Sequence, residues 1–496
     1  MKKITKPQIF KFDNTYINLP KNFYQKINPV PVKKPHLLKL NYELLDYFNL
    51  DADSIKSNLG VSILSGNKVP NNTTPLAMVY AGHQFGNFVD QLGDGRAVLL
   101  GEIISKDGLR YDLQLKGSGK TIFSRQGDGR SPLGPVIREY ILSEAMHYLG
   151  VPTTRSLSII GTGELVEREK IEPGGILVRI SSSHIRIGTF EFFNAKKDFV
   201  SVKKLCDYTI NRHFPEILSS KNPYKSFLNK VIESQARLIA QWINVGFIHG
   251  VMNTDNTSIS GQTIDYGPCA FMNNFDPNTV YSFIDVYGRY SYGNQPKIML
   301  WNLSKFAESI SFLIDEKKEE ANKVILNSLS KFPKLFDDFW TSAISKKLGL
   351  FENIKENRKL IEKFLEIMFE QKTDYTLTFR ALSESLENDK KKLKFFSLFK
   401  KNEPITNWYK DWSQRLEKEK YSKEKIEKKM KNKNPLFIPR NHLIEKCIND
   451  AVEKSDFSMV NDLLEVLKKP FEYNKKLSLG DPPKPSEDIK NTFCGT

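Results

Sequence analysis

The segment from His249 to Pro268, HGVMNTDNTSISGQTIDYGP, constrains the fold more than any other stretch of this chain. It holds Asp255 and Asn256 side by side, and a second acid, Asp265, just before a glycine turn. Amide and carboxylate oxygens close together are ligands that Mg²⁺ prefers. Apolar residues at helical spacing precede the segment and stop at Gly246, which predicts a long helix that leads into it. The pattern predicts a phosphate-and-metal site after a helix end.

The spacing within this segment is typical of kinase catalytic loops. His249 and Asn256 are spaced like the His and Asn of H-R-D-x-x-x-x-N, and Asp265 begins an Asp-Tyr-Gly triplet where Asp-Phe-Gly supplies a metal ligand. The kinase base falls at Val251, which cannot accept a proton. Phosphorylation of a hydroxyl with the usual base is therefore excluded, and Asp255 is the candidate for a relocated base or orienting carboxylate.

A strand and a helix upstream supply a candidate lysine and glutamate pair. The runs RAVLLGEII and LRYDLQLKG flank the turn SKDG and predict a β-hairpin, with Lys116 on the polar face of its second strand. Glu139 follows 23 residues later on the predicted helix SPLGPVIREYILSEAMHYLG. A carboxylate on a helix can hold a lysine against nucleotide phosphates in this arrangement. Either residue alone is more typical of surface charge.

Two further local patterns frame the candidate site. QLGDGRAVLL predicts a glycine turn opening into a strand, where backbone amides can approach phosphate, although a plain tight turn also explains it. After Asn256, the runs TSI and TI around SGQ predict a small hairpin that ends at Asp265.

Composition excludes several function classes. No apolar run is long enough for a membrane helix, and the start MKKITKPQIFKF lacks the apolar core of a signal peptide, so we expect a cytoplasmic protein. The net charge is +16, but residues 390–433 alone hold 16 Lys and Arg against 6 Asp and Glu. That segment mixes Lys with Glu as a solvated helix does, and no nucleic-acid-binding pattern accompanies it. The four cysteines contain no CxxC pair that predicts a zinc site or disulfide framework.

Three long stretches resemble one known family. They are YAGHQFGNFVDQLGDGRAVLLGEI, DLQLKGSGKTIFSRQGDGRSPLGPVIREYILSEAMHYLGVPTTRSL and HGVMNTDNTSISGQTIDYGPCAFM. They are similar to the selenoprotein O family of protein adenylyltransferases, a pseudokinase family, and the resemblance runs from about residue 20 to the terminal Cys-Gly-Thr. It implies an α+β, protein-kinase-like bilobal fold that binds ATP in flipped orientation. It also implies transfer of AMP to protein Ser, Thr or Tyr hydroxyls, with release of pyrophosphate.

Composition, local patterns and the resemblance together predict an organisation along the chain. Residues 1–60 are expected to form an arm on the body, 61–175 an N-lobe rich in strands, and 176–300 a helical C-lobe. Residues 301–475 are expected to be a helical extension, and 476–496 a tail that bears Cys494. The implied partners are acceptor proteins, with no specific nucleic acid and no membrane, and the chain is expected to be a monomer.

Site roles are likewise implied by the resemblance. Asp255 is the proton acceptor and Glu139 orients Lys116. Asn256 and Asp265 hold Mg²⁺ or Mn²⁺. The residues expected around ATP are Gly93, Gly95, Arg96, Lys116, Asp128, Gly129, Arg179, Arg186 and Asp265. Guanidinium groups match phosphate oxygens in a bidentate way, which suits the two arginines to this role, although arginines spaced like these are more often surface charge.

Redox control is a further implication of the family, through a disulfide between Cys494 and a cysteine after the Asp-Tyr-Gly triplet. Cys269 is the candidate partner, although a cysteine at such a position is more often a small buried residue. Two alternative functions stay open on the sequence. One is an atypical kinase that uses Asp255 as its base, and the other is a nucleotide-binding scaffold without catalysis.

Overall fold

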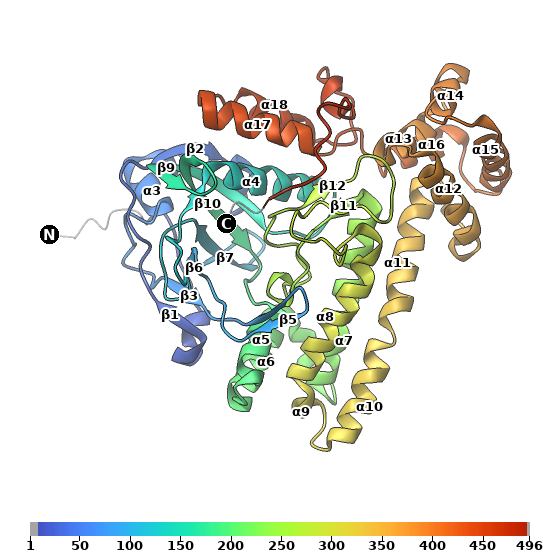
Figure 1. The fold of residues 1–496 in the computed structure, drawn as a ribbon. Helices are drawn as coiled ribbons and strands as arrows, with labels where there is room; N and C mark the ends of the chain where they lie inside the picture. The colour runs from blue at the N-terminus through green and yellow to red at the C-terminus, as the bar shows by residue number, and fades with distance from the viewer. Residues whose placement is uncertain (1–7, 494–496) are drawn as a thin grey trace.

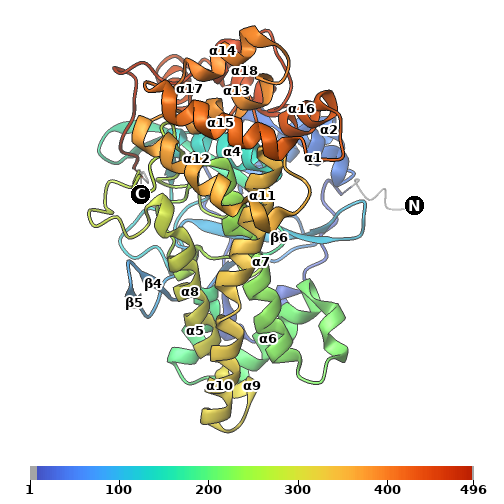
Figure 2. The ribbon, with the colours of Figure 1, turned by 90° about the vertical axis from the view of Figure 1, so that its right-hand side faces the viewer.

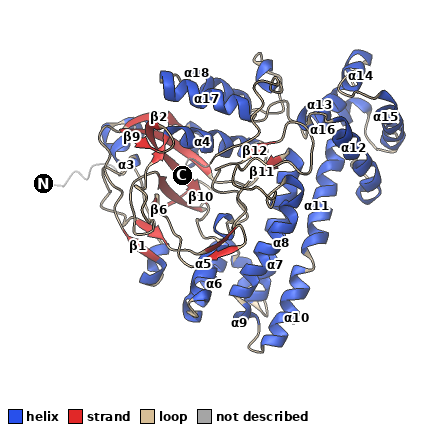
Figure 3. Ribbon diagram, in the orientation of Figure 1, coloured by secondary structure: helices blue, strands red, loops and turns tan. Residues whose placement is uncertain are grey.

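The computed structural model describes residues 8–493 and contains one large β-sheet and many helices, which confirms the predicted α+β class. The strands of the sheet come from the first 181 residues and lie on the left of Figure 1. The long helices of the later chain lie on the right, as the colouring by secondary structure in Figure 3 makes plain. Sheet and helical regions therefore follow one another along the sequence.

The large sheet is antiparallel, and two short strands from the first 40 residues form its edges. Its strands lie in the order β1 (Tyr24–Lys26), β3 (Leu76–Met78), β6 (Ala97–Ile104), β7 (Arg110–Lys116), β10 (Ile171–Ser181), β9 (Arg155–Glu167) and β2 (His36–Leu40), with β8 (Ser131–Pro132) paired to β10. Two small sheets pair β4 (Gly82–Gln84) with β5 (Asn87–Val89) and β11 (Phe247–Ile248) with β12 (Ala270–Phe271).

The hairpin predicted around SKDG is confirmed as β6 and β7. Leu113 and Leu115 of β7 are fully buried in an apolar cluster. Because side chains alternate along a strand, Gln114 and Lys116 point to the opposite face. Lys116 ends the strand, opposite Ala97 on β6 and Leu177 on β10. This register places the lysine at the end of the central strands, where the sheet meets the loops.

Helices cover both faces of the sheet. One face packs against α1 (Tyr42–Tyr47), α2 (Ala52–Lys56) and α3 (Asn58–Leu64) in the same apolar cluster as β7 and β10. The other face packs against α4 (Leu133–Tyr148), the predicted helix that carries Glu139. Ile137, Ile141 and Ala145 of α4 are fully buried. The helix is covered on its far side as well, because α17 (Asn441–Lys454) and α18 (Ser458–Leu467) pack on it.

The predicted long helix before the His249 segment is confirmed as α7 (Pro223–Val245). Asn222 caps its first turn by accepting a hydrogen bond from the Lys225 amide, and Pro223 occupies the first helical position. Gly246 ends it in the left-handed conformation, with φ +76°. The chain then enters β11 and the candidate loop.

Most of the remaining helices form the right-hand side of Figure 1, which faces the viewer in Figure 2, whereas α5 (Ile187–Ala195) and α6 (Phe199–His213) lie at the lower centre of Figure 1. The other helices are α8 (Gln295–Ser309), α9 (Ser311–Ile314), α10 (Lys318–Leu329), α11 (Phe332–Lys347), α12 (Arg358–Gln371), α13 (Tyr375–Glu384), α14 (Asp389–Phe396), α15 (Asn402–Leu416) and α16 (Lys423–Lys431). Short 3-10 helices are η1 (Tyr16–Asn18), η2 (Lys21–Phe23), η3 (Pro215–Ser219), η4 (Thr254–Asn256), η5 (Tyr292–Asn294), η6 (Ile354–Asn357) and η7 (Leu477–Gly480).

One local prediction is wrong. The runs TSI and TI around SGQ do not pair as a hairpin. Ser258 instead bridges Arg186, and Thr263 bridges Thr153 in the segment before β9. The backbone groups of this loop therefore find partners in other segments, and tertiary context overrides the local alternation. Across residues 8–493, no helix has the length and apolar character needed to cross a bilayer.

Candidate functional site

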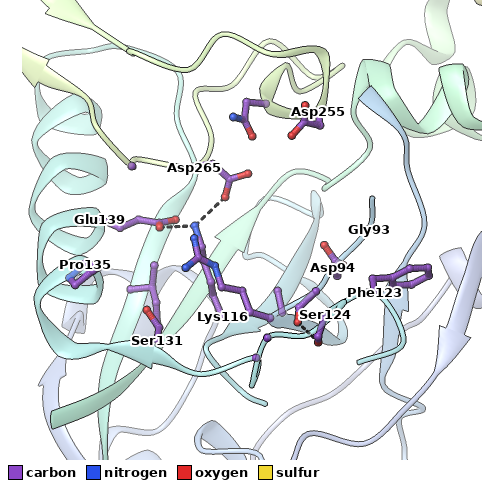
Figure 4. A pocket seen from close by; sticks show the side chains of 18 of the residues that line it. Gly93, Asp94, Lys116, Phe123, Ser124, Ser131, Pro135, Glu139, Asp255 and Asp265 are labelled. Atoms are coloured by element: carbon purple, nitrogen blue, oxygen red, sulfur yellow. Dashed lines mark hydrogen bonds and ion pairs between the residues drawn. The ribbon is translucent and has the colours of Figure 1, made fainter. Parts of the chain in front are cut away.

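A cavity of about 440 Å³ lies where the ends of β6, β7 and β10 meet α4 and the loop after α7 (Figure 4). Twelve of the site residues named from the sequence line it. They are Gly93, Gly95, Arg96, Lys116, Asp128, Gly129, Glu139, Arg179, Arg186, Asp255, Asn256 and Asp265. Residues up to 172 positions apart in sequence thus meet in one hollow, from Gly93 to Asp265.

Lys116 joins the strand, the helix and the loop. Its Nζ lies 2.6 Å from Oε2 of Glu139 on α4 and 2.8 Å from Oδ1 of Asp265. Figure 4 shows both contacts as dashed lines that converge on the lysine nitrogen. The predicted pairing of Lys116 with Glu139 is therefore present, and Asp265 is a second partner. An ammonium held between two carboxylates has a fixed position from which to meet an anionic ligand.

Asp265 is also held by two buried arginines. Arg179 Nη1 lies 2.6 Å from its Oδ1, and Arg186 Nη1 lies 2.5 Å from its Oδ2. Burial raises the pKa of this carboxyl, but the charges of Lys116, Arg186 and Arg179 outweigh burial and hold the pKa well below its usual range. Three cations thus face two carboxylates, those of Asp265 and Glu139. The excess of positive charge favours a polyphosphate in the cavity.

The backbone at Asp265 is unusual. Its φ is +61°, in the left-handed region that non-glycine residues rarely adopt. The Gly267 amide donates to the Asp265 carbonyl oxygen at 2.9 Å and closes a tight turn. Such conformations persist where surrounding contacts fix them, often at functional sites. Here the turn aims the carboxylate at the three cations.

Asp255 lies in η4 and has a different environment. Its side chain is buried, and the pKa is raised to about 6, mainly because burial disfavours the charged form, with Arg186 opposing that effect. Its Oδ1 is buried without a hydrogen-bond partner among the described residues. The two acids of the loop are therefore electrostatically distinct: Asp265 is ionised at any ordinary pH, and Asp255 titrates near pH 6.

Asn256 faces the same cavity from the end of η4. Its Nδ2 donates to the carbonyl oxygen of Val251 at 3.0 Å, which leaves Oδ1 as the free end of the amide. Val251 itself lines the cavity with an apolar side chain. No cluster of three or more His, Cys, Asp or Glu within residues 8–493 is arranged to hold a metal ion. Asn256 and Asp265 thus suit a cation that takes its other ligands from phosphate and water, as Mg²⁺ does.

The glycine turn packs too tightly for side chains. A Cβ on Gly93, whose φ is +126°, would lie 2.5 Å from the Phe123 ring. A Cβ on Gly95 would lie 2.8 Å from the Phe123 carbonyl oxygen. The two glycines therefore let the turn lie directly under the loop around Phe123. Arg96 follows them on the cavity wall.

Polar residues at the cavity were missed from the sequence, among them Gln84, Asp94 and Arg168 in its lining and Gln114 behind it. Asp128 pairs with Arg168, whose Nη2 lies 2.7 Å from Oδ1. Asp94 accepts hydrogen bonds from the Met78 amide at 3.0 Å and from Gln114 Nε2 at 3.2 Å. Gln114 Oε1 in turn accepts from Arg179 Nη2 at 2.6 Å, so the amide links Asp94 to that arginine. Gln84 contacts Asp255 from β4. Gln114 was detectable, because it alternates with the apolar residues of β7 on the face that carries Lys116.

His249 supports the loop without facing the cavity. Burial lowers its pKa, so the ring is neutral. Nε2 donates to the Ile264 carbonyl oxygen at 2.9 Å, and Nδ1 accepts from the Val251 amide at 3.3 Å. The ring therefore ties the start of the loop to the residue before Asp265.

The redox candidate Cys269 is not among the residues that line the cavity. Cys269 is buried. Cys494 lies outside the described residues, so its pairing with Cys269 stays a prediction. Thr492, two residues earlier, donates from Oγ1 to the Pro268 carbonyl oxygen at 2.6 Å. The tail thus reaches the segment next to Cys269.

Comparison with known proteins gives a consistent result. The family model described as "Protein adenylyltransferase SelO" matches residues 8–468. "Protein nucleotidyltransferase YdiU" of Rhizobium meliloti is 48% identical over 488 residues, covering 98% of this chain and 99% of that protein. The protein of the same name from Bacillus mycoides is 49% identical and covers 98% of each chain. That from Bacillus cytotoxicus is 48% identical over the full length of both.

Proposed function

The chain belongs to the SelO family of protein adenylyltransferases, and from this premise we propose that it transfers AMP from ATP to Ser, Thr or Tyr hydroxyls of proteins. It is a nucleotidyltransferase, as its relatives are by name. The observation that carries the finer proposal is the separation of charge in the cavity. Three cations surround Asp265, whereas Asp255 keeps a buried carboxylate outside that cluster.

This separation supports ATP bound in the flipped orientation. The β- and γ-phosphates carry most of the negative charge of ATP, so they are expected beside Lys116, Arg179 and Arg186. Asp255 lies outside these direct ion pairs, and the α-phosphate is then the one nearest to it. A guanidinium and ammonium cluster stabilises the charge that develops on the leaving pyrophosphate.

In the proposed reaction, Asp255 is the proton acceptor. The acceptor hydroxyl gives its proton to the Asp255 carboxylate, and the hydroxyl oxygen forms a bond to the α-phosphorus. The bond between the α-phosphorus and the oxygen that bridges to the β-phosphate breaks, and its electron pair leaves with pyrophosphate. A carboxylate with a pKa near 6 is a stronger base than an exposed one and is still ionised at neutral pH. Val251, at the usual kinase position, leaves this task to Asp255.

Asn256 and Asp265 are the residues that would hold a divalent cation. Bound with ATP, Mg²⁺ or Mn²⁺ supplies positive charge to the phosphate oxygens. The Asn256 amide is oriented by Val251, and the Asp265 carboxylate by its three cationic neighbours. Both oxygen donors are thus fixed before ATP arrives.

We infer a protein-kinase-like arrangement of two lobes around the cavity. Residues 61–175 would form the N-lobe and residues 176–300 the C-lobe, with the helices of residues 301–475 as an extension. The pair between a strand lysine and a helix glutamate supports this arrangement, as does the metal-ligand pattern in the loop. The sheet continues through β10 to Ser181, so we propose to move the lobe junction from residue 175, the boundary expected from the sequence, to the end of that strand.

Labelled ATP tests the function directly. The protein is incubated with Mg²⁺ and a total protein extract as acceptor, once with ATP labelled at the α-phosphate and once with ATP labelled at the γ-phosphate. We expect covalent label only from the α-phosphate. Label only from the γ-phosphate would support the atypical kinase, and label from neither would support the scaffold without catalysis. The Asp265→Ala variant is the negative control.

A further inference from the structure

The loop of residues 281–290, which follows β12, is fastened to the rim of the cavity. Tyr290 Oη donates to Asn253 Oδ1 at 2.6 Å, and the Phe85 amide donates to Tyr290 Oη at 3.1 Å. Asn253 lines the cavity two residues before Asp255, and Phe85 follows β4. One hydroxyl thus joins this loop to the β4–β5 hairpin and to the segment that leads into η4. The loop therefore lies on the side of the cavity that carries Asp255.

The loop has a fixed shape because its one acid caps its own backbone. Asp285 is the only Asp or Glu within residues 281–290, and its side chain is buried. Its Oδ1 accepts from the Arg289 amide at 2.9 Å, and its Oδ2 accepts from the Tyr290 amide at 2.7 Å. Both carboxylate oxygens are therefore occupied by backbone donors. The acid fixes the backbone at Arg289 but does not pair with its side chain.

The guanidinium of Arg289 lies between aromatic rings and a glycine turn. Its Cζ lies 5.0 Å from the ring centroid of Trp301 on α8 and 5.7 Å from that of Tyr290. The hairpin approaches as well, because a Cβ on Gly86, whose φ is +88°, would lie 3.5 Å from Cζ and Nη2 of this arginine. Contact with aromatic rings occupies the face of a guanidinium and leaves the N–H groups at its edge for an acceptor. Arg289 therefore has a defined position with donors to spare.

The charge of Arg289 is not neutralised within the described part of the chain. No carboxylate there forms an ion pair with it, and its Nε is buried without a hydrogen-bond partner. By contrast, Arg179 and Arg186 inside the cavity both pair with Asp265. A half-buried cation without a counter-charge gains free energy when an anionic group binds to it. Arg289 is thus a cation on the rim that is available to a carboxylate of another molecule.

Apolar side chains on the same rim face solvent. Val286 and Tyr287 are the two most exposed large apolar residues within residues 8–493, at 81% and 99%. Ile284 on the same loop and Phe88 on β5 are exposed too. Clustered exposed apolar residues mark surfaces that bind other proteins, and Tyr, Trp and Arg are typical of the strongest contacts in such surfaces. In the proposed reaction an acceptor protein approaches this side of the cavity, so it is the partner that fits the rim.

We propose that the rim formed by residues 284–289 and the β4–β5 hairpin binds the acceptor protein, and that Arg289 selects acceptors with an Asp or Glu beside the modified hydroxyl. The inference rests on the proposed function. The apolar side chains supply contact area, and the guanidinium supplies the selection, because it can bind a carboxylate through two parallel hydrogen bonds. Arg289 determines specificity and takes no part in the transfer step.

Mapping of modified sites tests the selection. The protein is incubated with ATP, Mg²⁺ and a total protein extract, and AMP-modified residues are located by mass spectrometry. We expect Asp and Glu to be enriched around modified hydroxyls relative to unmodified ones in the same proteins. Arg289→Gln should lose this enrichment, and Arg289→Glu should favour Lys and Arg instead. Arg237→Gln is the matched control, since Arg237 lies 4.3 Å from the Phe339 ring on another surface, and it should keep the acidic preference.

Peptide kinetics measure the pairing directly. A peptide that copies the most strongly modified site is made with its flanking acid as Glu, Gln or Lys. With the unsubstituted protein, kcat/KM should fall by about five- to tenfold from the Glu to the Gln peptide, the effect of one ion pair with charged hydrogen bonds. Arg289→Gln should use both peptides equally, and Arg289→Glu should prefer the Lys peptide. The KM for ATP should be unchanged, because Arg289 is not among the residues that line the cavity.

The apolar part of the rim has its own test. Tyr287→Ser should raise the KM for the intact protein that carries this site by about fivefold, the effect of one truncated interface residue, without changing the acidic preference. Leu326→Ser, at an exposed position on α10, is the matched control and should leave this KM unchanged. Light scattering gives the oligomeric state. A dimer that Tyr287→Ser dissociates would show that the rim joins two copies of this chain, and the proposal would be wrong.

The outcomes separate this inference from the proposed function. If the unsubstituted protein transfers no label from the α-phosphate, the proposed function fails and this inference fails with it. If it transfers label but the modified sites lack acidic neighbours, or keep them in both Arg289 variants, only the inference fails. Thermal melting checks that each variant is folded. Should Arg289→Glu be unfolded, the comparison of the Glu and Gln peptides with Arg289→Gln decides alone.

Discussion

Arg186 contacts Asp255 at its backbone and not at its carboxylate: Nη1 donates to the Asp255 carbonyl oxygen at 2.6 Å. The same nitrogen lies 2.5 Å from Oδ2 of Asp265. Within residues 8–493, the Asp255 carboxylate has no ion pair. One guanidinium therefore fixes the positions of both acids but neutralises only Asp265. The raised pKa of Asp255, due first to burial, follows from this arrangement.

The first prediction concerns catalysis by Asp255. Asp255→Asn keeps the shape of the side chain and removes the base, so the transfer rate should fall by about 10²- to 10⁴-fold while ATP still binds. In the unsubstituted protein, the rate should rise with pH through about 6 as the carboxylate ionises. Initial rates with α-labelled ATP between pH 5 and 8.5 measure both. A rate in Asp255→Asn within threefold of the unsubstituted protein would exclude Asp255 as the base.

The second prediction concerns stability. The folded pKa of Asp255 is about 6, above its unfolded value near 4, so ionisation at neutral pH costs folding free energy. Asp255→Asn should therefore be more stable by on the order of 2 kcal/mol at pH 8. The difference should shrink as pH falls through 6 and vanish below 4, where both forms are neutral. Urea unfolding at pH 8, 6 and 4 measures it. A difference independent of pH would contradict the assigned pKa.

The third prediction concerns Asp265. Its carboxylate competes with phosphate for Lys116, Arg179 and Arg186, and it is also the proposed metal ligand. Asp265→Asn should therefore lower transfer at least about 100-fold with Mg²⁺. In EDTA, however, the same variant should bind ATP more tightly than the unsubstituted protein, because a negative charge has left the cation cluster. Calorimetric titration with ATP in EDTA and in Mg²⁺ distinguishes the two effects. Weaker binding under both conditions would show that the carboxylate only supports the fold.

The fourth prediction concerns Glu139. It lies 2.6 Å from Lys116 Nζ and 3.1 Å from Arg179 Nη1, so Glu139→Gln frees two cations at once. Transfer should fall by about 10- to 100-fold, with a higher KM for ATP, since both phosphate-binding groups lose orientation. Glu453→Gln, at an exposed position on α17, is the matched control and should leave both constants unchanged. Equal kinetics for the two variants would contradict the orienting role of Glu139.

The sequence predicted part of the ion-pair cluster formed by Lys116, Glu139, Asp265 and Arg179. The alternation along β7 and the helical spacing of α4 placed Lys116 and Glu139 on facing surfaces. The spacing within the loop selected Asp255, Asn256 and Asp265 as a group. Local periodicity carries such information because it fixes the face on which each side chain lies.

Other contacts could not be predicted from the periodicity of the sequence. Gln84 meets Asp255 across 171 positions, and Asp128 meets Arg168 through two loops. Such pairs depend on how strands and loops pack, which no local pattern encodes. The mistaken hairpin around Gly261 has the same origin, because Ser258 and Thr263 pair with distant segments. The sheet edges β1 and β2 were hidden by the proline-rich character of the first 60 residues.

The cover on α4 has a consequence for biosynthesis. Arg138, next to Glu139 on this helix, donates to Asn441 Oδ1 and lies 3.0 Å from Glu445 Oε1, both on α17. During translation, residue 139 leaves the ribosome some 300 codons before α17 does. A nascent chain therefore gains this cover on α4 only after residues 441–467 have been synthesised.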